Sequence, residues 1–115
     1  MKKENLLLII STDNVESMMK FPLLYGGVSI PRGYWKRVHI MFWGPSIKQA
    51  KSNIEIRKKV IDMKHDGVEF SSCIVCAEDY NAKDELEAIG IECIHTGDLL
   101  NEALQNDKKW ATLTI

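Results

Sequence analysis

Short apolar segments separated by amphipathic stretches recur along the whole chain. The first, Leu6 to Ile10, is a continuous apolar run followed by the polar sequence "STDN". Such a run is typical of a strand that is covered on both faces, as in a parallel sheet. Further strands are predicted at 37–44, 68–75, 91–95 and 110–115. The pattern therefore predicts five strands.

The segment after the first strand has the periodicity of a helix. Asp13 and Glu16 fit a capping box at its start, and the apolar stripe ends near Gly26 and Gly27. Pro22 lies inside this segment, where it removes a backbone donor and clashes with the preceding turn. We therefore predict one helix that is kinked at Pro22.

Two candidate caps follow the second strand in close succession, Ser46 with Gln49 and Ser52 with Glu55. They predict a short helical piece over 47–51 and a longer helix over 53–65. The buried face of the longer helix is expected to include Ile54, Val60 and Ile61. The remaining helices are expected from Val75 or Cys76 to Tyr80, over 83–89, and over 96–106 with Thr96 or Asp98 as its cap.

Alternating strands and helices with short connections predict an α/β domain with a parallel sheet. Right-handed crossovers then place helices on both faces of the sheet. A chain of 115 residues fits a single domain, 1–115. Ligands of such sheets sit outside the carboxyl ends of the strands, which are expected here at 11–14, 44–46, 73–76 and 96–98.

The charge balance and the length of the apolar runs exclude several classes of partner. A formal net charge of -1 gives no broad field for polyanions, so we expect neither nucleic acid nor a membrane as partner. The opening apolar run stops at Ile10 and lacks the cleavage site of a signal peptide. No run approaches the roughly 18 residues that span a bilayer. We expect a cytoplasmic protein.

The three cysteines cannot all pair within one chain, and a reducing compartment leaves them as free thiols. Cys73 and Cys76 lie three positions apart at a strand-to-helix junction, a spacing that also occurs in thioredoxin-like dithiols. All three prolines precede Cys73, however, whereas a thioredoxin-like site needs a later one. A second alternative is a zinc site, to which Cys93 and His95 would add two ligands. The third is that the cysteines only pack.

Two further features carry candidate chemistry. His39 lies in the middle of a strand and is expected to be a hydrogen-bonded core or interface residue, whereas His95 ends the fourth strand on the ligand side. The basic and aromatic stretch 30–37 favours a subunit contact over nucleic acid. The loop after the first strand lacks the glycines of a dinucleotide site, so no such cofactor is expected.

Four segments together resemble a known family. They are "LLLIISTDN", "GYWKRVHIMFWGPSIK", "DGVEFSSCIVCAEDYNA" and "LEAIGIECIHTGDLLNEAL". In this order and spacing the chain resembles, over nearly its whole length, the DsrE/DsrF-like sulfur-transfer family, which includes sulfur-relay subunits of TusD type. The resemblance implies a three-layer α/β/α sandwich with five mainly parallel strands. It also implies a homo-oligomer, either a dimer, a trimer or a hexamer.

The resemblance further implies a role for the thiols. In the family the sulfur-accepting cysteine ends the third strand, a position held here by Cys73. The expected function is to carry sulfane sulfur as a persulfide between donor and acceptor proteins, as a carrier rather than a turnover enzyme, with no cofactor and no metal. Cys76 stands where a small apolar residue is common, so it is either a resolving thiol or a packing residue. The expected pocket lining is Thr12, Asp13, Gly44, Ser46 and His95.

A second hypothesis keeps the fold and changes the function. The chain would be a non-enzymatic oligomeric binding or regulatory module whose pocket holds a small anion or a partner, and its thiols would be incidental. Alanine at both Cys73 and Cys76 would then leave partner binding intact.

Overall fold

Five parallel strands form one sheet in the computed structural model, which describes residues 2–115. The strands are β1 (Asn5–Ile10), β2 (Arg37–Phe42), β3 (Glu69–Cys73), β4 (Glu92–Ile94) and β5 (Trp110–Thr114). Their order across the sheet is β4-β3-β2-β1-β5, and every neighbouring pair is parallel. The prediction of a five-stranded parallel α/β sheet is confirmed.

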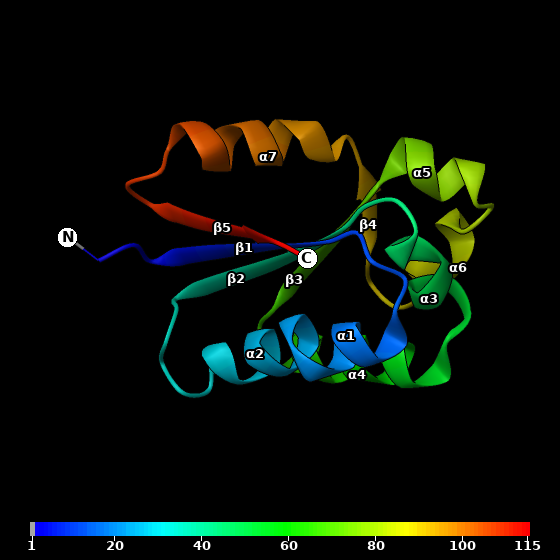
Figure 1. The fold of residues 1–115 in the computed structure, drawn as a ribbon, viewed down its shortest axis with the longest axis horizontal. Coiled ribbons are helices and arrows are strands. Elements are labelled where there is room, and N and C mark those ends of the chain that lie inside the picture. Colours follow the sequence, from blue (N-terminus) through cyan, green and yellow to red (C-terminus); the bar gives the residue numbers. More distant parts are fainter. Residues whose placement is uncertain (1) are drawn as a thin grey trace.

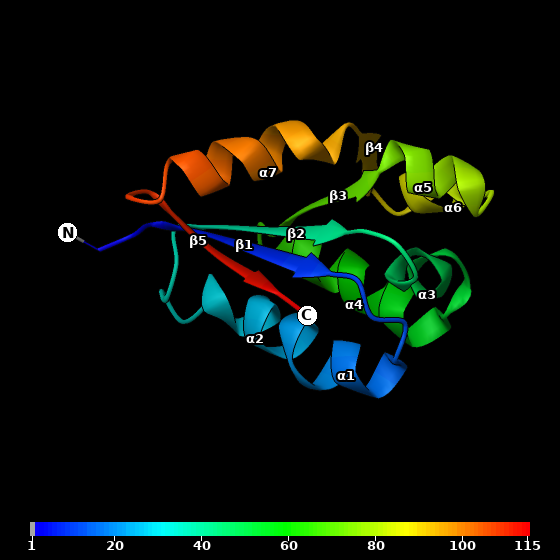
Figure 2. The ribbon, with the colours of Figure 1, turned by 45° about the horizontal axis from the view of Figure 1, so that its top comes forward.

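Helices cover both faces of this sheet. They are α1 (Val15–Lys20), α2 (Pro22–Ser29), α3 (Ser46–Ser52), α4 (Ile54–His65), α5 (Ile74–Asp79), α6 (Lys83–Ala88) and α7 (Thr96–Gln105). In Figure 1, α7 lies alone along one face, and α1, α2 and α4 lie along the other. Figure 2 shows α3, α5 and α6 gathered at the end toward which the strand arrows point. This is the three-layer α/β/α sandwich that the sequence predicts.

The larger core lies between the sheet and the layer of α1, α2 and α4. It is built from alternate strand residues and the inner faces of the helices, including Leu6, Leu8, Ile10, Val38, Ile40, Phe42, Phe70, Met18, Leu23, Ile56, Val60 and Met63. The rings of Phe42 and Phe70 stack with centroids 6.1 Å apart. Gly26 lets α2 approach closely, because a Cβ there would lie 3.1 Å from Ile40 Cδ1. This layer is continuous and apolar.

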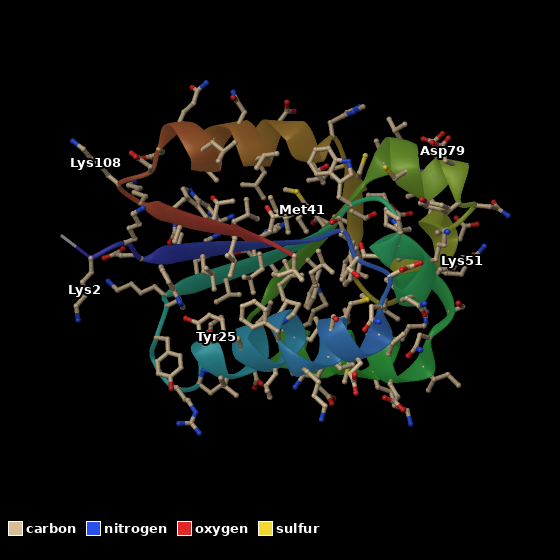
Figure 3. All side chains as sticks on the ribbon, in the orientation of Figure 1. Lys2, Tyr25, Met41, Lys51, Asp79 and Lys108 are labelled. Atoms are coloured by element: carbon tan, nitrogen blue, oxygen red, sulfur yellow. The ribbon has the colours of Figure 1, made fainter. Side chains whose placement is uncertain are left out.

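The core on the α7 face is smaller. Its buried members are Leu7, Ile9, Met41, Ala103 and Trp110. Figure 3 shows Met41 between the sheet and α7, whereas Tyr25 lies in the opposite layer. Polar strand residues share this second face, and they include the candidate site.

The predicted kinked helix is wrong, because the segment forms two helices. α1 ends at Lys20 and α2 starts at Pro22, with Phe21 between them at φ -125° and ψ -79°. At the first position of a helix proline does not reduce helix stability, because an N–H at that position has no carbonyl partner within the helix. The predicted capping box at Asp13 is also wrong. Asn14 caps α1 instead, with Oδ1 accepting a 2.8 Å hydrogen bond from the Ser17 N–H.

The predicted buried face of the second long helix is wrong in two of its three members. Ile54 and Ile61 are 68% and 41% exposed, and only Val60 is buried as expected. Ile56, Val60 and Met63 face the sheet instead. Asn53, not Ser52, caps this helix by accepting the Ile56 N–H at 3.0 Å. The predicted and the observed sets of apolar residues both have helical spacing. Only contact with the sheet determines which set is buried.

Several element ends also differ from the predictions. β3 stops at Cys73, and α5 begins at once at Ile74 instead of at Val75 or Cys76. His95 is the cap residue of α7 in place of Thr96 or Asp98, and no side chain hydrogen-bonds there. Ends of short elements depend on cap geometry, which apolar periodicity does not report.

Candidate functional site

Cys73 is the point where β3 becomes α5. It is the last residue of the strand and the cap residue of the helix, with φ -58° and ψ 120°. Its side chain makes no capping hydrogen bond. The thiol therefore sits at the carboxyl edge of the sheet beside the free N–H groups of the first turn of α5. This is the edge at which parallel sheets place ligands.

The exposure of Cys73 decides whether any reaction can reach it. The residue is buried, with 9% of its surface exposed. The next residues open outward, since Ile74 and Cys76 are half-buried and Val75 is 59% exposed. Cys73 is thus a buried residue at the rim of the sheet, next to residues that are partly or largely exposed.

Cys76 lies one helical turn after Cys73, and the two side chains interact. Burial raises the pKa of the Cys76 thiol, and its hydrogen bond to Cys73 and the charges of Cys73 and Asp79 raise it further. A hydrogen bond from the backbone of Gly44 acts in the opposite direction without reversing the shift. Cys76 therefore keeps its proton at neutral pH.

Gly44 and Ser46 belong to the loop that follows β2, the neighbour of β3. Gly44 has φ 67°, a left-handed conformation that favours glycine. Ser46 is fully buried, and its Oγ donates to the Ile10 carbonyl at 2.5 Å. The Ser46 N–H donates to the Ser11 carbonyl at 3.2 Å. Ser46 thereby joins the ends of β1 and β2 and holds Gly44 against Cys76.

Thr12 and Asp13 lie farther from the thiols than the loop of Gly44. They follow β1, which β2 separates from β3, so two strand spacings of together about 10 Å intervene. Thr12 Oγ1 accepts the Asn14 N–H at 3.2 Å, and the Asp13 carbonyl accepts from Gln49 at 3.1 Å. Both residues shape the loop after β1.

His95 lies on the other side of the thiols. It follows β4, whose Ile94 is the register partner of Cys73, and it is exposed. A groove of about 570 Å³ begins at Ile74, next to Cys73. Its lining residues are Ile74, Cys93, Ile94, His95, Asp98, Leu99 and Glu102. His95 and Cys73 thus border the same rim of the molecule.

The four candidate zinc ligands do not come together. Cys93 pairs with Ser72 in register and belongs to the larger buried cluster, where its strand contacts α5 and α6. Cys73 is one residue further along β3 and so points to the other face. Within residues 2–115 no three His, Cys, Asp or Glu side chains are placed to hold a metal ion.

The expectation that His39 is a hydrogen-bonded core residue is confirmed, but sequence reasoning missed its partners, which form a polar network on the same face of β3 as Cys73. The ring of His39 contacts Glu69 Oε1 through Nδ1 at 3.0 Å and Ser71 Oγ through Nε2 at 2.7 Å. Glu69 in turn accepts two hydrogen bonds from Arg37, at 2.8 and 2.9 Å. Polar residues alternating in two buried strands, Arg37 with His39 and Glu69 with Ser71, were the available signal.

The network is structural in character. Burial lowers the pKa of His39, although Glu69 opposes this shift. Burial would raise the pKa of Glu69, but hydrogen bonds from Arg37 and His39 outweigh it and the pKa is lowered. A neutral His39 satisfies both partners, donating from Nδ1 to Glu69 and accepting the Ser71 hydroxyl proton at Nε2. Ser71 has no exposed surface, and its bond to His39 links β2 to β3 inside the protein.

Comparison with known proteins gives structural neighbours. No family model and no curated protein matches the chain. A conserved protein of unknown function from Bacteroides thetaiotaomicron, BT1422, shares 27% identity over 97% of this chain and 95% of its own, with a TM-score of 0.91. The ychN protein from E. coli shares 12% identity over 99% of this chain and 100% of its own, with a TM-score of 0.70. These neighbours show that solved proteins share the five-stranded α/β fold of this chain, and they identify no family.

The search for membrane-spanning segments covered the described chain. Among the helices within residues 2–115, none has both the length and the apolar character needed to cross a membrane.

Proposed function

We propose that this protein carries sulfane sulfur as a persulfide on Cys73 and passes it to the thiol of a partner protein. The observation that carries the proposal is the position of Cys73, which ends β3 at the carboxyl edge of the sheet and has 9% of its surface exposed. The exposed Val75 beside it gives a partner room to approach.

The chemistry of such a carrier consists of two sulfur transfers. In loading, the Cys73 thiolate attacks the terminal sulfur of a donor persulfide, the donor S–S bond breaks, and the donor leaves as a thiolate. In unloading, the acceptor thiolate attacks the outer sulfur on Cys73, and Cys73 leaves as a thiolate. The sulfane sulfur keeps its oxidation state in both steps, so no cofactor is needed.

The proposal includes partners and a location. Sulfur donor and acceptor proteins are required by the chemistry, and a reducing cytoplasm would keep the three thiols free. A homo-oligomer is supported by an apolar patch on and near α2, where Phe21, Leu24 and Tyr34 are 45%, 52% and 52% exposed. A second copy of the chain would cover this patch.

The test is to load purified protein with inorganic polysulfide and weigh its peptides without reduction. Trypsin leaves Cys73 and Cys76 together in the peptide 65–83 and Cys93 in the peptide 84–108. Fragmentation, together with a Cys76→Ser variant, assigns the added sulfur within the first peptide. We expect one added sulfur atom on Cys73 in Cys76→Ser, where no neighbouring thiol can displace it, and none in Cys73→Ser.

Two results would contradict the proposal. One is a peptide 65–83 that never gains the mass of a sulfur atom even in Cys76→Ser, and the other is equal gain after Cys73→Ser. Either would favour the binding module with incidental thiols.

A further inference from the structure

We propose that Cys76 resolves the Cys73 persulfide by forming an internal Cys73–Cys76 disulfide and releasing hydrosulfide. This inference rests on the proposed function and adds an activity to it. The chain would then both carry sulfane sulfur and, when no acceptor thiol arrives, reduce it.

The geometry of the strand-to-helix junction supports this assignment. Cys73 is the cap residue of α5 and Cys76 is the third residue of that helix. In a capping box these two positions bring their side chains back toward each other's backbone, so they are neighbours in space. Cys73 is near enough to raise the pKa of the Cys76 thiol, and no capping bond occupies the Cys73 sulfur. Cys76 is thus the thiol placed to meet a persulfide on Cys73.

Cys93 serves as a natural contrast. It lies on β4, packs in the core of the opposite face and is register partner to Ser72. An attack by Cys93 on Cys73 would require it to cross the sheet. Among the three thiols of residues 2–115, the fold pairs only Cys73 and Cys76.

The reaction balances without an external oxidant. The terminal sulfur of the Cys73 persulfide anion takes the proton that Cys76 retains, and the Cys76 thiolate attacks the inner sulfur, Sγ of Cys73. The Cys73–Cys76 bond forms, the bond to the terminal sulfur breaks, and that sulfur leaves as HS⁻. The sulfane sulfur gains two electrons, and the two cysteines lose them in forming the disulfide. An added dithiol would return the chain to its reduced state.

Burial affects the timing of this step. The raised pKa of Cys76 keeps its thiolate scarce at rest, which protects a fresh persulfide from immediate attack. An acceptor protein therefore has time to take the sulfur before hydrosulfide is released.

The experiment loads the full chain briefly with inorganic polysulfide, removes the excess, and follows two signals with time. One is hydrosulfide in solution, and the other is the unreduced mass of the chain. We expect the wild type and Cys93→Ala to release one hydrosulfide per chain and to end two hydrogen atoms lighter than the reduced chain. Cys76→Ser should hold the Cys73 persulfide at least about tenfold longer, because its hydroxyl is no substitute for a thiolate.

Cys76→Ala provides a second variant without a polar group, and thermal melting of both variants verifies that they fold. Dithiothreitol should return the oxidised wild type to the reduced mass and allow a second loading. Equal persulfide lifetimes in the wild type and both Cys76 variants would overturn the resolving role and leave the carrier function intact. If Cys73 fails to load even in Cys76→Ser, both proposals fail.

Discussion

The two faces of the sheet differ in composition, and β3 shows the difference within one strand. Phe70 points into the large apolar core under α1, α2 and α4. Glu69, Ser71 and Cys73 point to the α7 face, where Glu69 and Ser71 bind His39. Alternation along a single strand thus gives one face to packing and the other to polar contacts and the thiol. Stability and chemistry can therefore be changed separately.

The largest loss of stability is expected from the apolar face. Phe42 is fully buried against Phe70, so Phe42→Ala should lower the free energy of unfolding by about 3–5 kcal/mol through lost contacts and a cavity. Leu113→Ala, at a 42% exposed position on the edge strand β5, should cost about 1 kcal/mol or less. Urea unfolding measures both. Similar losses in the two variants would contradict the assignment of the main core.

The second effect comes from the polar network of the α7 face. Glu69→Gln removes the charge that accepts from Arg37 and His39, so we expect a loss of about 1–3 kcal/mol. The matched control is Glu4→Gln, whose exposed pair with Lys36 should contribute about 0.5 kcal/mol or less. If both variants unfold at the same urea concentration, the network does not hold the strands together.

A smaller change in the free energy of unfolding is expected when the pH is lowered. The folded pKa of His39 lies below its ordinary value of 6.5, so the unfolded chain binds more protons just below that value. The stability contributed by neutral His39 is complete above 6.5 and is lost as the pH falls toward the folded pKa. The lowered pKa of Glu69 adds a further loss only below its ordinary value of 4.5.

The measurement is urea unfolding of the wild type and two variants across this range of pH. His39→Gln should flatten the dependence on pH below 6.5. His65→Gln, at the exposed end of α4, should keep the slope of the wild type. A slope that survives His39→Gln would assign the dependence to other groups.

The smallest change in stability is expected at the proposed sulfur carrier itself. Serine is a preferred cap residue, and Cys73 caps α5 without a side-chain hydrogen bond. A capping bond in Cys73→Ser should offset the lost thiol contacts, so the free energy of unfolding should change by about 0.5 kcal/mol or less. Sulfur loading should nevertheless be lost. A serine that preserves folding but abolishes loading separates the two roles.

Cys93→Ser makes the same substitution on the other face of the sheet, and its effect on stability is compared with that of Cys73→Ser. There the hydroxyl would enter an apolar core with no partner, at a cost of about 1–3 kcal/mol. Equal stability of the two serine variants would contradict the distinction between the faces.

Much of the fold could be predicted from apolar runs, because each strand lies in a covered sheet. The run at Leu6 to Ile10 belongs to the central part of the sheet and was located with its carboxyl end correct. The buried face and the first residue of each helix were harder to predict from the sequence. Ile54 and Ile56 are both apolar, and only contact with β3 and α2 determines which of them is buried.

For the candidate site, the sequence located Cys73 and could not supply its surroundings. The predicted strand ran two residues beyond the end of β3, and the place of Cys73 at the strand end came from the family resemblance. The contact of Gly44 with Cys76 depends on β2 lying beside β3. The network of His39 likewise requires the register that pairs His39 with Glu69, two residues separated by thirty positions. Such contacts between distant segments are fixed only once the strands are ordered.

The most direct test of the account is the mass of the peptide 65–83 from protein purified without reductant after expression with a sulfur donor. The account predicts a fraction of this peptide heavier by one sulfur atom, with the added mass on Cys73 and sensitive to a thiol reductant. It also predicts that the peptide 84–108, which contains Cys93, carries none. A peptide 65–83 that stays unmodified under every donor tried, or one whose sulfur sits elsewhere than on Cys73, would contradict the central claim.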